Sequence, residues 1–418
     1  MLAEHGNISV GIDLGRDYSQ IAFCSKSDRA PLMVMQSEEE KEENDYLIRT
    51  PVDLFSLVER KDARGVEVLY QFLKECFALL KGAGSVEHMT VMVTMHEMKG
   101  IWSDVIRTAL LKLGIPSSAI FLQGHLESFY AYLMNQKKEL LTYHVALLEY
   151  ERDCITAWHF WLERKTKPVL AKTEKCFRLY LDNKARKGRG DEEWGILRDS
   201  LLHKNLEKMF ENTPFSAVYL VGREFEGEWM DKSFRFLCRK RRSFRGDNLY
   251  TMGACYAAME ENGATACKDT LYLSDDMIQH NLGMWMEIRG QEGYYPLVNA
   301  GINWYMARHT CEFLLGDEKE VVIYSRTVRG EEMEHTLALS QLPDRPRRAT
   351  RLRLPLPHRT DAGCGRRILD LVNCIRLPVK SGKQISAFPE KGRKGRNDGN
   401  VSVVSCESGE TSVLYREY

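Results

Sequence analysis

The sequence predicts an α/β fold built from two similar halves, followed by a module of β-strands. Through about residue 265, short apolar runs alternate with segments whose apolar residues recur at helical spacing, and this pattern occurs twice. From residue 266, apolar runs separated by Gly, Asp and Pro continue without a convincing long helix. The duplication lies in the pattern rather than in residue identity, so we infer two related lobes and then a β-sandwich.

The first half is predicted to begin with a hairpin. Two short apolar runs, 8–15 and 19–24, are joined by the polar turn 16–18. The continuous apolar run at 89–95 is typical of a buried strand. The other elements expected in this half are helices at 66–81, 102–113 and 125–136 and a strand at 118–122.

The second half repeats this order of elements. Three strands in a meander are expected at 143–149, 154–162 and 167–173. A helix at 194–210 and a buried strand at 216–222, which ends in Gly, follow. The remaining expected elements are helices at 226–238 and 248–260, and strands at 270–273, 281–288, 319–325 and 334–340.

These elements predict a division into domains. Residues 1–265 form the duplicated domain, with lobe I at about 1–142 and lobe II at about 143–265. A linker at 266–275 leads to the β-sandwich at 276–388. The tail at 389–418 begins with a stretch low in apolar residues, so we expect part of it to be disordered.

Composition excludes several classes of function. The 418 residues are 44% hydrophobic and 28% charged, as in ordinary globular proteins. Lys+Arg and Asp+Glu both number 59, so no net charge favours nucleic acid as a partner. No apolar stretch reaches the length of a membrane span, and the N-terminus does not resemble a signal peptide. Eleven cysteines without CxxC pairs indicate reduced thiols, hence a cytoplasmic protein.

Four stretches, in order, carry a family resemblance. Residues 10–18 read VGIDLGRDY, and 91–132 form a strand–helix–strand–helix segment that ends in SFYAYL. Residues 217–226 and 246–258 read AVYLVGREFE and GDNLYTMGACYAA, and 268–286 read KDTLYLSDDMIQHNLGMWM. In order and spacing, these stretches resemble the DnaK-type heat-shock chaperones of the actin/hexokinase-like ATPase superfamily, as a divergent and degenerate member.

The resemblance implies a fold and a ligand. The fold would be a two-lobed actin-like (ribonuclease H-like) ATPase domain followed by a β-sandwich that binds polypeptide. The ligand would be ATP or ADP with Mg²⁺, which Asp13 would hold through water. The cofactor-binding residues implied in this way are Asp13, Gly15, Arg16, Asp17, Tyr18, Gly222, Arg223, Glu224, Asp247 and Gly253.

The chemistry of these positions agrees with that expectation. A turn with Gly15 at its centre exposes backbone N–H groups, which can surround phosphate oxygens. A glycine at a strand end, Gly222, lets the backbone approach an adenine-ribose unit closely. The alternative is that these glycines are turn residues without a ligand.

The sequence departs from the family at decisive points. Arg16 and Asp17 stand where the family has two threonines, and Arg223 stands in place of a glycine. The family's second phosphate loop is Gly-rich, whereas 147–153 read LLEYERD, in which Glu149 and its bulky neighbours would block phosphate. The family's catalytic lysine has no counterpart that can be aligned, so no catalytic residue is predicted.

Two functions are therefore expected. The first is a chaperone-like protein with a degenerate ATP-binding domain, weak or absent ATP hydrolysis, and a β-domain that contacts polypeptide. The alternative is a non-enzymatic pseudo-ATPase scaffold for a partner protein. A small-molecule kinase is disfavoured because the sequence has no Gly-rich second loop and no candidate general base. The histidines lack HxxxH spacing, so they predict no metal site.

Overall fold

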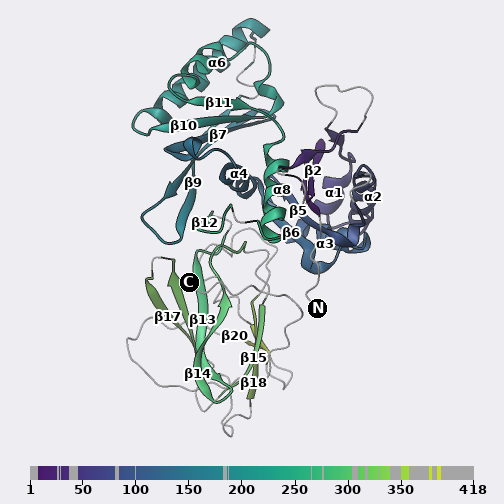
Figure 1. Ribbon diagram of the computed structural model, residues 1–418, viewed down its shortest axis with the longest axis vertical. Coiled ribbons are helices and arrows are strands. Elements are labelled where there is room, and N and C mark those ends of the chain that lie inside the picture. Colours follow the sequence, from purple (N-terminus) through teal and green to yellow (C-terminus); the bar gives the residue numbers. More distant parts are fainter. Residues whose placement is uncertain are drawn as a thin grey trace. The chain divides into compact units, whose positions relative to one another are not determined.

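The structure is a computed structural model (Figure 1). It describes residues 8–25, 28, 30–36, 46–80, 84–98, 100–181, 186, 188–264, 266–274, 277–303, 309–315, 319–328, 330–338, 350–356, 376–378 and 384–386. The tail at 389–418 lies outside these residues, as does most of the region beyond 356. The chain divides into two compact units: unit 1 is Met1–Met98 with Ala109–Ser274, and unit 2 is Lys99–Thr108 with Asp275–Tyr418.

The first sheet of unit 1 has the strand order β3-β2-β1-β5-β6, and β4 pairs with β2. β1 is antiparallel to β2 and parallel to β5, and β5 is parallel to β6. The strands are β1 (Ile8–Asp13), β2 (Tyr18–Ser25), β3 (Leu32–Met33), β4 (Ile48–Arg49), β5 (Met89–Met95) and β6 (Ile120–Gly124). The helices of this half are α1 (Leu54–Glu59), α2 (Arg64–Ala78) and α4 (His125–Met134). Between β5 and β6 the chain also forms α3 (Gly100–Lys112), whose residues up to Thr108 are assigned to unit 2.

The second sheet of unit 1 has the order β11-β10-β7-β8-β9-β12. Its strands are β7 (His144–Glu151), β8 (Cys154–Glu163), β9 (Val169–Tyr180), β10 (Phe215–Val221), β11 (Arg242–Arg245) and β12 (Thr270–Leu273). The helices are α6 (Asp191–Phe210), α7 (Asp231–Leu237) and α8 (Leu249–Glu261). Short 3₁₀ helices lie at Val86–His88, Ser117–Ala119, Lys138–Leu141 and Arg223–Phe225.

The two sheets share one topology. The strand order of the first sheet is β3-β2-β1-β5-β6, and the corresponding order in the second sheet is β9-β8-β7-β10-β11. In each sheet the first strand of the meander lies in the centre, between the rest of the meander and the two later strands. In both, the first three strands are an antiparallel meander and the later strands are parallel to the first. The duplication predicted from the pattern of elements is therefore present in the strand order.

Residues alternate between the two faces of the second sheet, as in any strand. Ala146, Leu148 and Tyr150 of β7 belong to the core cluster that includes Trp194 and Leu202 of α6. On the other face, Phe129 of α4 meets Phe160 of β8 and Tyr219 of β10, with ring centroids 6.4 and 5.5 Å apart. One face is thus covered by α6 and the opposite face by α4, the last helix of the first half (Figure 1).

The last helix of the second half covers the first sheet in return. A Cβ added to Gly11 of β1 would lie 2.3 Å from the backbone nitrogen of Cys255 in α8. A Cβ added to Gly253 of α8 would lie 1.9 Å from the carbonyl oxygen of Ser128 in α4. These close approaches require glycine, because any side chain would collide with backbone atoms. The two helices therefore pack on each other and each covers the sheet of the other half.

The segment predicted as a linker, 266–275, is in part a strand. β12 pairs in parallel with β9 at the edge of the second sheet. Tyr272 is buried, stacks on Tyr130 of α4 at 5.0 Å, and its hydroxyl lies 2.9 Å from that of Thr173. Because the stack on Tyr130 anchors it, β12 belongs to the second sheet of unit 1. It does not belong to the β-module, where the position of this apolar run after residue 266 had placed it.

Unit 2 carries a four-stranded antiparallel sheet of order β14-β13-β16-β17 and a pair β15-β18. The strands are β13 (His280–Ile288), β14 (Gln291–Val298), β15 (His309–Leu315), β16 (Glu320–Thr327), β17 (Glu332–Ala338), β18 (Thr350–Leu356), β19 (Arg376–Pro378) and β20 (Gln384–Ser386). A β-rich C-terminal part was predicted, although β14, β15, β18, β19 and β20 were not.

Smaller differences concern short elements. The helix predicted at 226–238 is limited to α7, after a 3₁₀ turn, and α1 and β11 were not predicted. These elements have at most seven residues, too few to show a periodicity. Among helices within the described ranges, not one combines the length and the apolar character needed to cross a bilayer.

Candidate functional site

Four polar side chains stand where central strands of unit 1 end. Asp13 closes β1, His96 follows β5, and His125 is the first residue of α4 after β6. Glu149 lies near the end of β7. Side chains alternate between the two faces of a strand, and this alternation explains why Asp13 and Glu149 reach the same place. Asp13 continues the face on which Gly11 contacts α8, and Glu149 follows Val145 and Leu147 on the face opposite the α6 core.

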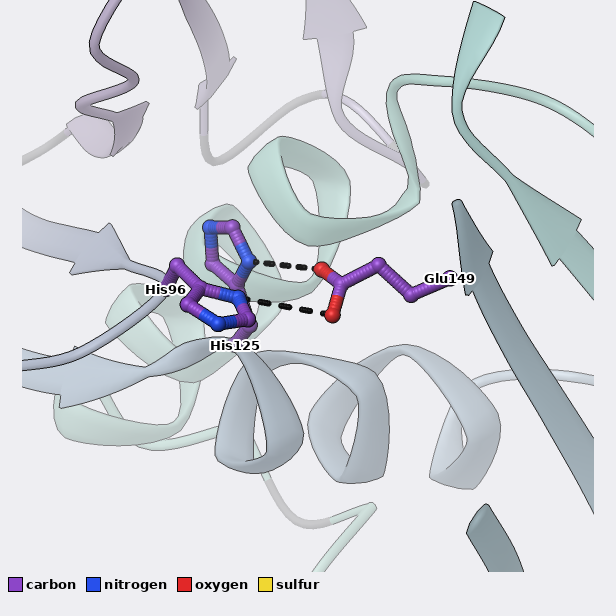
Figure 2. A group of neighbouring side chains, drawn as sticks. All are labelled: His96, His125 and Glu149. Atoms are coloured by element: carbon purple, nitrogen blue, oxygen red, sulfur yellow. Dashed lines mark hydrogen bonds and ion pairs between the residues drawn. The ribbon is translucent and has the colours of Figure 1, made fainter. Parts of the chain in front are cut away.

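His125 lies between two carboxylates. Its Nε2 is 2.9 Å from Oδ1 of Asp13, and its Nδ1 is 3.4 Å from Oε1 of Glu149. The other carboxylate oxygen of Glu149 is 3.4 Å from Nδ1 of His96. Figure 2 shows the two imidazole rings on one side of the carboxylate, each directed at a different oxygen. We call His96, His125 and Glu149 the histidine–glutamate cluster.

Burial and charge shift the pKa values in this cluster. Burial alone would lower the pKa of His125, but Asp13 and Glu149 outweigh it and raise the pKa to about 10. Burial favours the neutral form of Glu149, yet hydrogen bonds from His125 and His96 bring its pKa well below the usual range. The hydrogen bond to Glu149 is the main cause that raises the pKa of His96. The cluster therefore pairs a buried carboxylate with imidazolium.

Tyr250 of α8 closes one side of the cluster. Its ring stacks on His125 with centroids 3.9 Å apart and planes inclined by 15°. Burial, followed by the charge of Glu149, raises the pKa of the Tyr250 hydroxyl well above its usual value. The opposite side is more open, since the side chain of His96 is 36% exposed and Nδ1 of His96 lies 3.7 Å from Oε2 of the exposed Glu151.

The predicted first phosphate loop is a turn whose backbone and side chains contact other residues of the same chain. A Cβ on Gly15 would lie 2.1 Å from the carbonyl oxygen of Tyr18, so the turn requires glycine. The hydroxyl of Thr50 donates to the carbonyl of Gly15, and the Thr50 amide donates to that of Asp17. Arg16 pairs with Glu59 of α1 at 2.6 Å, and so is directed neither to Asp17 nor toward the cluster.

The residues predicted to surround adenosine form separate contacts. Gly222, at φ +119°, donates its amide to Oδ1 of Asp247, and a Cβ there would lie 2.1 Å from the carbonyl of Tyr150. Arg223 lies 5.7 Å above the ring of Tyr18, which joins the two halves by a cation–π contact. Burial raises the pKa of Glu224 and of Asp247. Gly253 serves the contact between α8 and α4.

Where the resembled family has its Gly-rich second phosphate loop, the hairpin at 144–163 has a tight turn without glycine. β7 continues to Glu151, and only Arg152 and Asp153 separate it from β8. Arg152 adopts a left-handed φ of 56° in this tight turn. With Asp13 bound to His125 and a side chain at every position of this hairpin turn, the residues present do not fit Mg²⁺ with a triphosphate.

Sequence reasoning missed His96 and His125, because it looked for histidines at short spacing along one helix. A usable signal was present. His96 comes two residues after Thr94 of β5, and His125 comes two residues after Gln123 of β6. The side chains of Thr94 and Gln123 both form hydrogen bonds with Ser128 of α4. Thr94 and Gln123 thus face α4, and each histidine comes directly after the end of its strand. Metal-ligand residue types just beyond parallel strands were the signal that could have predicted this site.

Two family profiles match the sequence. The one described as "Family of unknown function (DUF5716) C-terminal" matches residues 53–275, and "Domain of unknown function (DUF8552)" matches 277–371. No curated protein matches the chain. These matches give no support to the DnaK-type kinship specifically.

Solved structures resemble the chain only distantly. The Ppx/GppA phosphatase of Aquifex aeolicus is 14% identical over 52% of this chain and 67% of its own, with a TM-score of 0.33. The ROK hexokinase of Thermus thermophilus is 12% identical over 61% of this chain and 99% of its own, with a TM-score of 0.34. A Bacteroides thetaiotaomicron protein described as having an actin-like ATPase fold is 10% identical over 61% of this chain and 98% of its own, with a TM-score of 0.34. At such scores, these likenesses carry no conclusion about function.

Proposed function

The chain belongs to the DUF5716 family, whose function is unknown, and we propose that it is a non-enzymatic scaffold. In this proposal residues 1–265 are an actin-like domain of two lobes, about 1–142 and 143–265, that does not hydrolyse ATP. Residues 276–388 contact polypeptide. The partner is a protein, and neither a membrane nor nucleic acid takes part.

One observation carries the proposal: the carboxylates of Asp13 and Glu149 both approach the ring of His125. In the resembled family, the carboxylate at the position of Asp13 would hold hydrated Mg²⁺. Hydrolysis requires that ion and a positioned water, held by two phosphate loops together. Here the carboxylate contacts an imidazole, and β7 turns directly into β8. This arrangement supports a scaffold that has lost the reaction.

The chaperone-like function is the second candidate, and an exposed aromatic face in unit 2 favours it. Leu282, Met284 and Met286 of β13 are buried, whereas Trp285 between them is 44% exposed. Trp285 lies 5.6 Å from Tyr294, whose ring covers Gly283 on the same face. Aromatic side chains on an open sheet face are suited to hold apolar segments of a polypeptide.

The ATPase test uses the purified full chain with Mg-ATP. We expect a flat calorimetric titration and no phosphate release above that of the Asp13→Asn variant. The matched control is Asp62→Asn, since Asp62 pairs with Arg64 on the surface, away from the cluster. Saturable turnover in the native chain and in Asp62→Asn that is lost in Asp13→Asn would show that the site is an ATPase.

The polypeptide test measures the anisotropy of a labelled, permanently unfolded polypeptide added to the full chain. Replacement of a central aromatic side chain at a contact weakens binding by about tenfold or more. We expect that loss for Trp285→Ser. Ile196→Ser is the control, because Ile196 is an exposed apolar side chain of α6 in unit 1. Equal binding by both variants and the native chain removes this face from the proposal.

A further inference from the structure

We propose that the histidine–glutamate cluster binds one divalent transition-metal ion, with Zn²⁺ the best match, and that Asp13 positions His125 for it. His96, His125 and Glu149 each offer one ligand atom, and these atoms lie within 4.8 Å of one another. This inference goes beyond the proposed scaffold, which requires no metal.

The ligand types select the kind of ion. Two imidazoles with one glutamate form a donor set that zinc accepts, with further positions left for water or another ligand. Imidazole suits zinc and its transition-metal neighbours, whereas Mg²⁺ and Ca²⁺ prefer oxygen alone. The ion that the resembled family would hold at this end of the sheet is thus not the one these residues suit.

Two of the three spacings agree with ligands around an ion, and all three ligand atoms lie within 4.8 Å of one another. Nδ1 of His125 and Nδ1 of His96 each lie 3.4 Å from an oxygen of Glu149. Charge-assisted hydrogen bonds are shorter, about 2.7–2.9 Å. Atoms bound to tetrahedral zinc at its usual bond lengths lie about 3.3 Å apart. By contrast, the contact between Nε2 of His125 and Asp13 is 2.9 Å, an ordinary hydrogen-bond length.

Asp13 supplies the outer contact that metal-binding histidines usually have. When Nε2 of His125 donates its proton to Asp13, the lone pair of Nδ1 faces Oε1 of Glu149. Without an ion, a proton on Nδ1 joins these two atoms; a bound ion would take the place of that proton. The stacked ring of Tyr250, 3.9 Å away, holds the plane of His125 in this orientation.

An entry side and a fourth donor are present. The side chain of His96 is 36% exposed, so an ion can reach the cluster from solvent. Glu151, 54% exposed, places a carboxylate oxygen 3.7 Å from Nδ1 of His96. Because His96 follows β5 of the first sheet and Glu149 lies in β7 of the second, the ion would tie the two sheets together.

The test titrates the chelator-treated full chain with Zn²⁺ alone, in competition with a chromophoric chelator. We expect one equivalent to bind and to raise the thermal midpoint. Loss of an outer-shell partner weakens metal sites by about 10–100-fold, and Asp13→Asn should fall in that range. His96→Gln, which removes a ligand, should lose at least as much. His159→Gln is the matched control, because His159 pairs with Glu174 at 3.1 Å and not with a member of the cluster.

A second readout identifies the ligands. Co²⁺ bound to the native chain should show visible absorption bands that are weakened or moved in His96→Gln, whose fold is checked by circular dichroism. If His96→Gln binds Zn²⁺ as tightly as the native chain and gives the same Co²⁺ spectrum, the assignment is wrong. No nucleotide enters this experiment, so its outcome is independent of the ATPase test.

Discussion

His125 carries a large electrostatic consequence for unit 1, because carboxylates from two different sheets contact its ring. Glu149 is 8% exposed and Asp13 9% exposed, so neither is fully solvated when His125 is absent. Breaking a buried ion pair by removal of one partner leaves an uncompensated charge, which costs about 3–5 kcal/mol. An exposed pair such as Lys112 with Glu67 contributes far less, because solvent screens its charges.

The first prediction concerns His125→Gln and pH, in the presence of a chelator. We expect the variant to lower the free energy of urea unfolding by about 3–5 kcal/mol at pH 6. The folded state raises the pKa of His125 from 6.5 to about 10, so the folded protein holds this proton more tightly. Its contribution is complete below pH 6.5 and is lost as pH rises toward 10.

The measurement is the difference in unfolding free energy between the native chain and His125→Gln at several pH values. The difference should shrink steadily from pH 6.5 to 10. A difference that stays constant or grows over this range would contradict the proposed ion pairing. Lys112→Gln, which removes an exposed ion pair, is the control for the effect of lost surface charge.

At the scale of elements, α4 and α8 organise unit 1, because each packs on the sheet of the other half and both meet at Gly253. The contact is made by backbone, so no rotamer change can relieve an added methyl group. The sequence contained this glycine, but the predicted role was adenosine binding. Helical periodicity shows that a residue is in a helix and does not show what lies against it.

The second prediction compares two glycine substitutions in helices. In Gly253→Ala the new Cβ would lie 1.9 Å from a backbone oxygen, so we expect a loss of about 3 kcal/mol, at the upper end for overpacking. In Gly195→Ala of α6 the new Cβ would lie 3.5 Å from Cβ of Trp229, an ordinary contact. The better helix propensity of alanine should leave that variant equal or more stable.

Thermal and urea unfolding of both variants provide the measurement. If Gly253→Ala were as stable as Gly195→Ala, the close packing of α8 on α4 would be disproved.

The third prediction concerns β12, the strand found within the predicted linker. Tyr272→Ala removes a buried aromatic ring, which typically costs about 3–5 kcal/mol. Tyr272→Phe keeps the stack on Tyr130 and loses the hydroxyl contact with Thr173, about 1 kcal/mol. Limited proteolysis near residue 270 should therefore be fast in the alanine variant and nearly native in the phenylalanine variant. Equal cleavage rates in both would show that the stack does not hold the strand.

At the scale of the molecule, each unit has its own internal organisation, and unit 1 is duplicated. The two sheets of unit 1 exchange their last helices, so neither sheet keeps its covering helix if the other half unfolds. Such an exchange predicts one cooperative unit rather than two independent lobes.

The fourth prediction follows for native-state hydrogen exchange. The slowest amides of β1 and β5 should share their opening free energy with those of β7 and β10, within about 1 kcal/mol. All four strands are nearly fully buried, so each supplies slow amides to compare. Exchange of one sheet at a clearly lower denaturant concentration than the other would mean that the lobes unfold separately.

Much of the fold was predictable because long strands and helices are local patterns. The runs at 89–95 and 216–222 are apolar enough to indicate buried strands by themselves, and they are β5 and β10 within a residue. Short elements such as β11 and α1 depend on neighbours for their stability. Of the four residues that meet at the candidate site, the sequence drew attention to Asp13, as a holder of Mg²⁺, and to Glu149, as an obstacle to phosphate, but not to the two histidines.

The sequence by itself determined the order of elements, the duplication and the β-rich C-terminal part, because hydrophobic periodicity is set residue by residue along the chain. Only the tertiary structure decided that Asp13, His96, His125 and Glu149 meet. They come from four strand ends far apart in the sequence, and their contact depends on how two sheets and two exchanged helices pack. Such packing is a property of the folded molecule, and no local pattern encodes it.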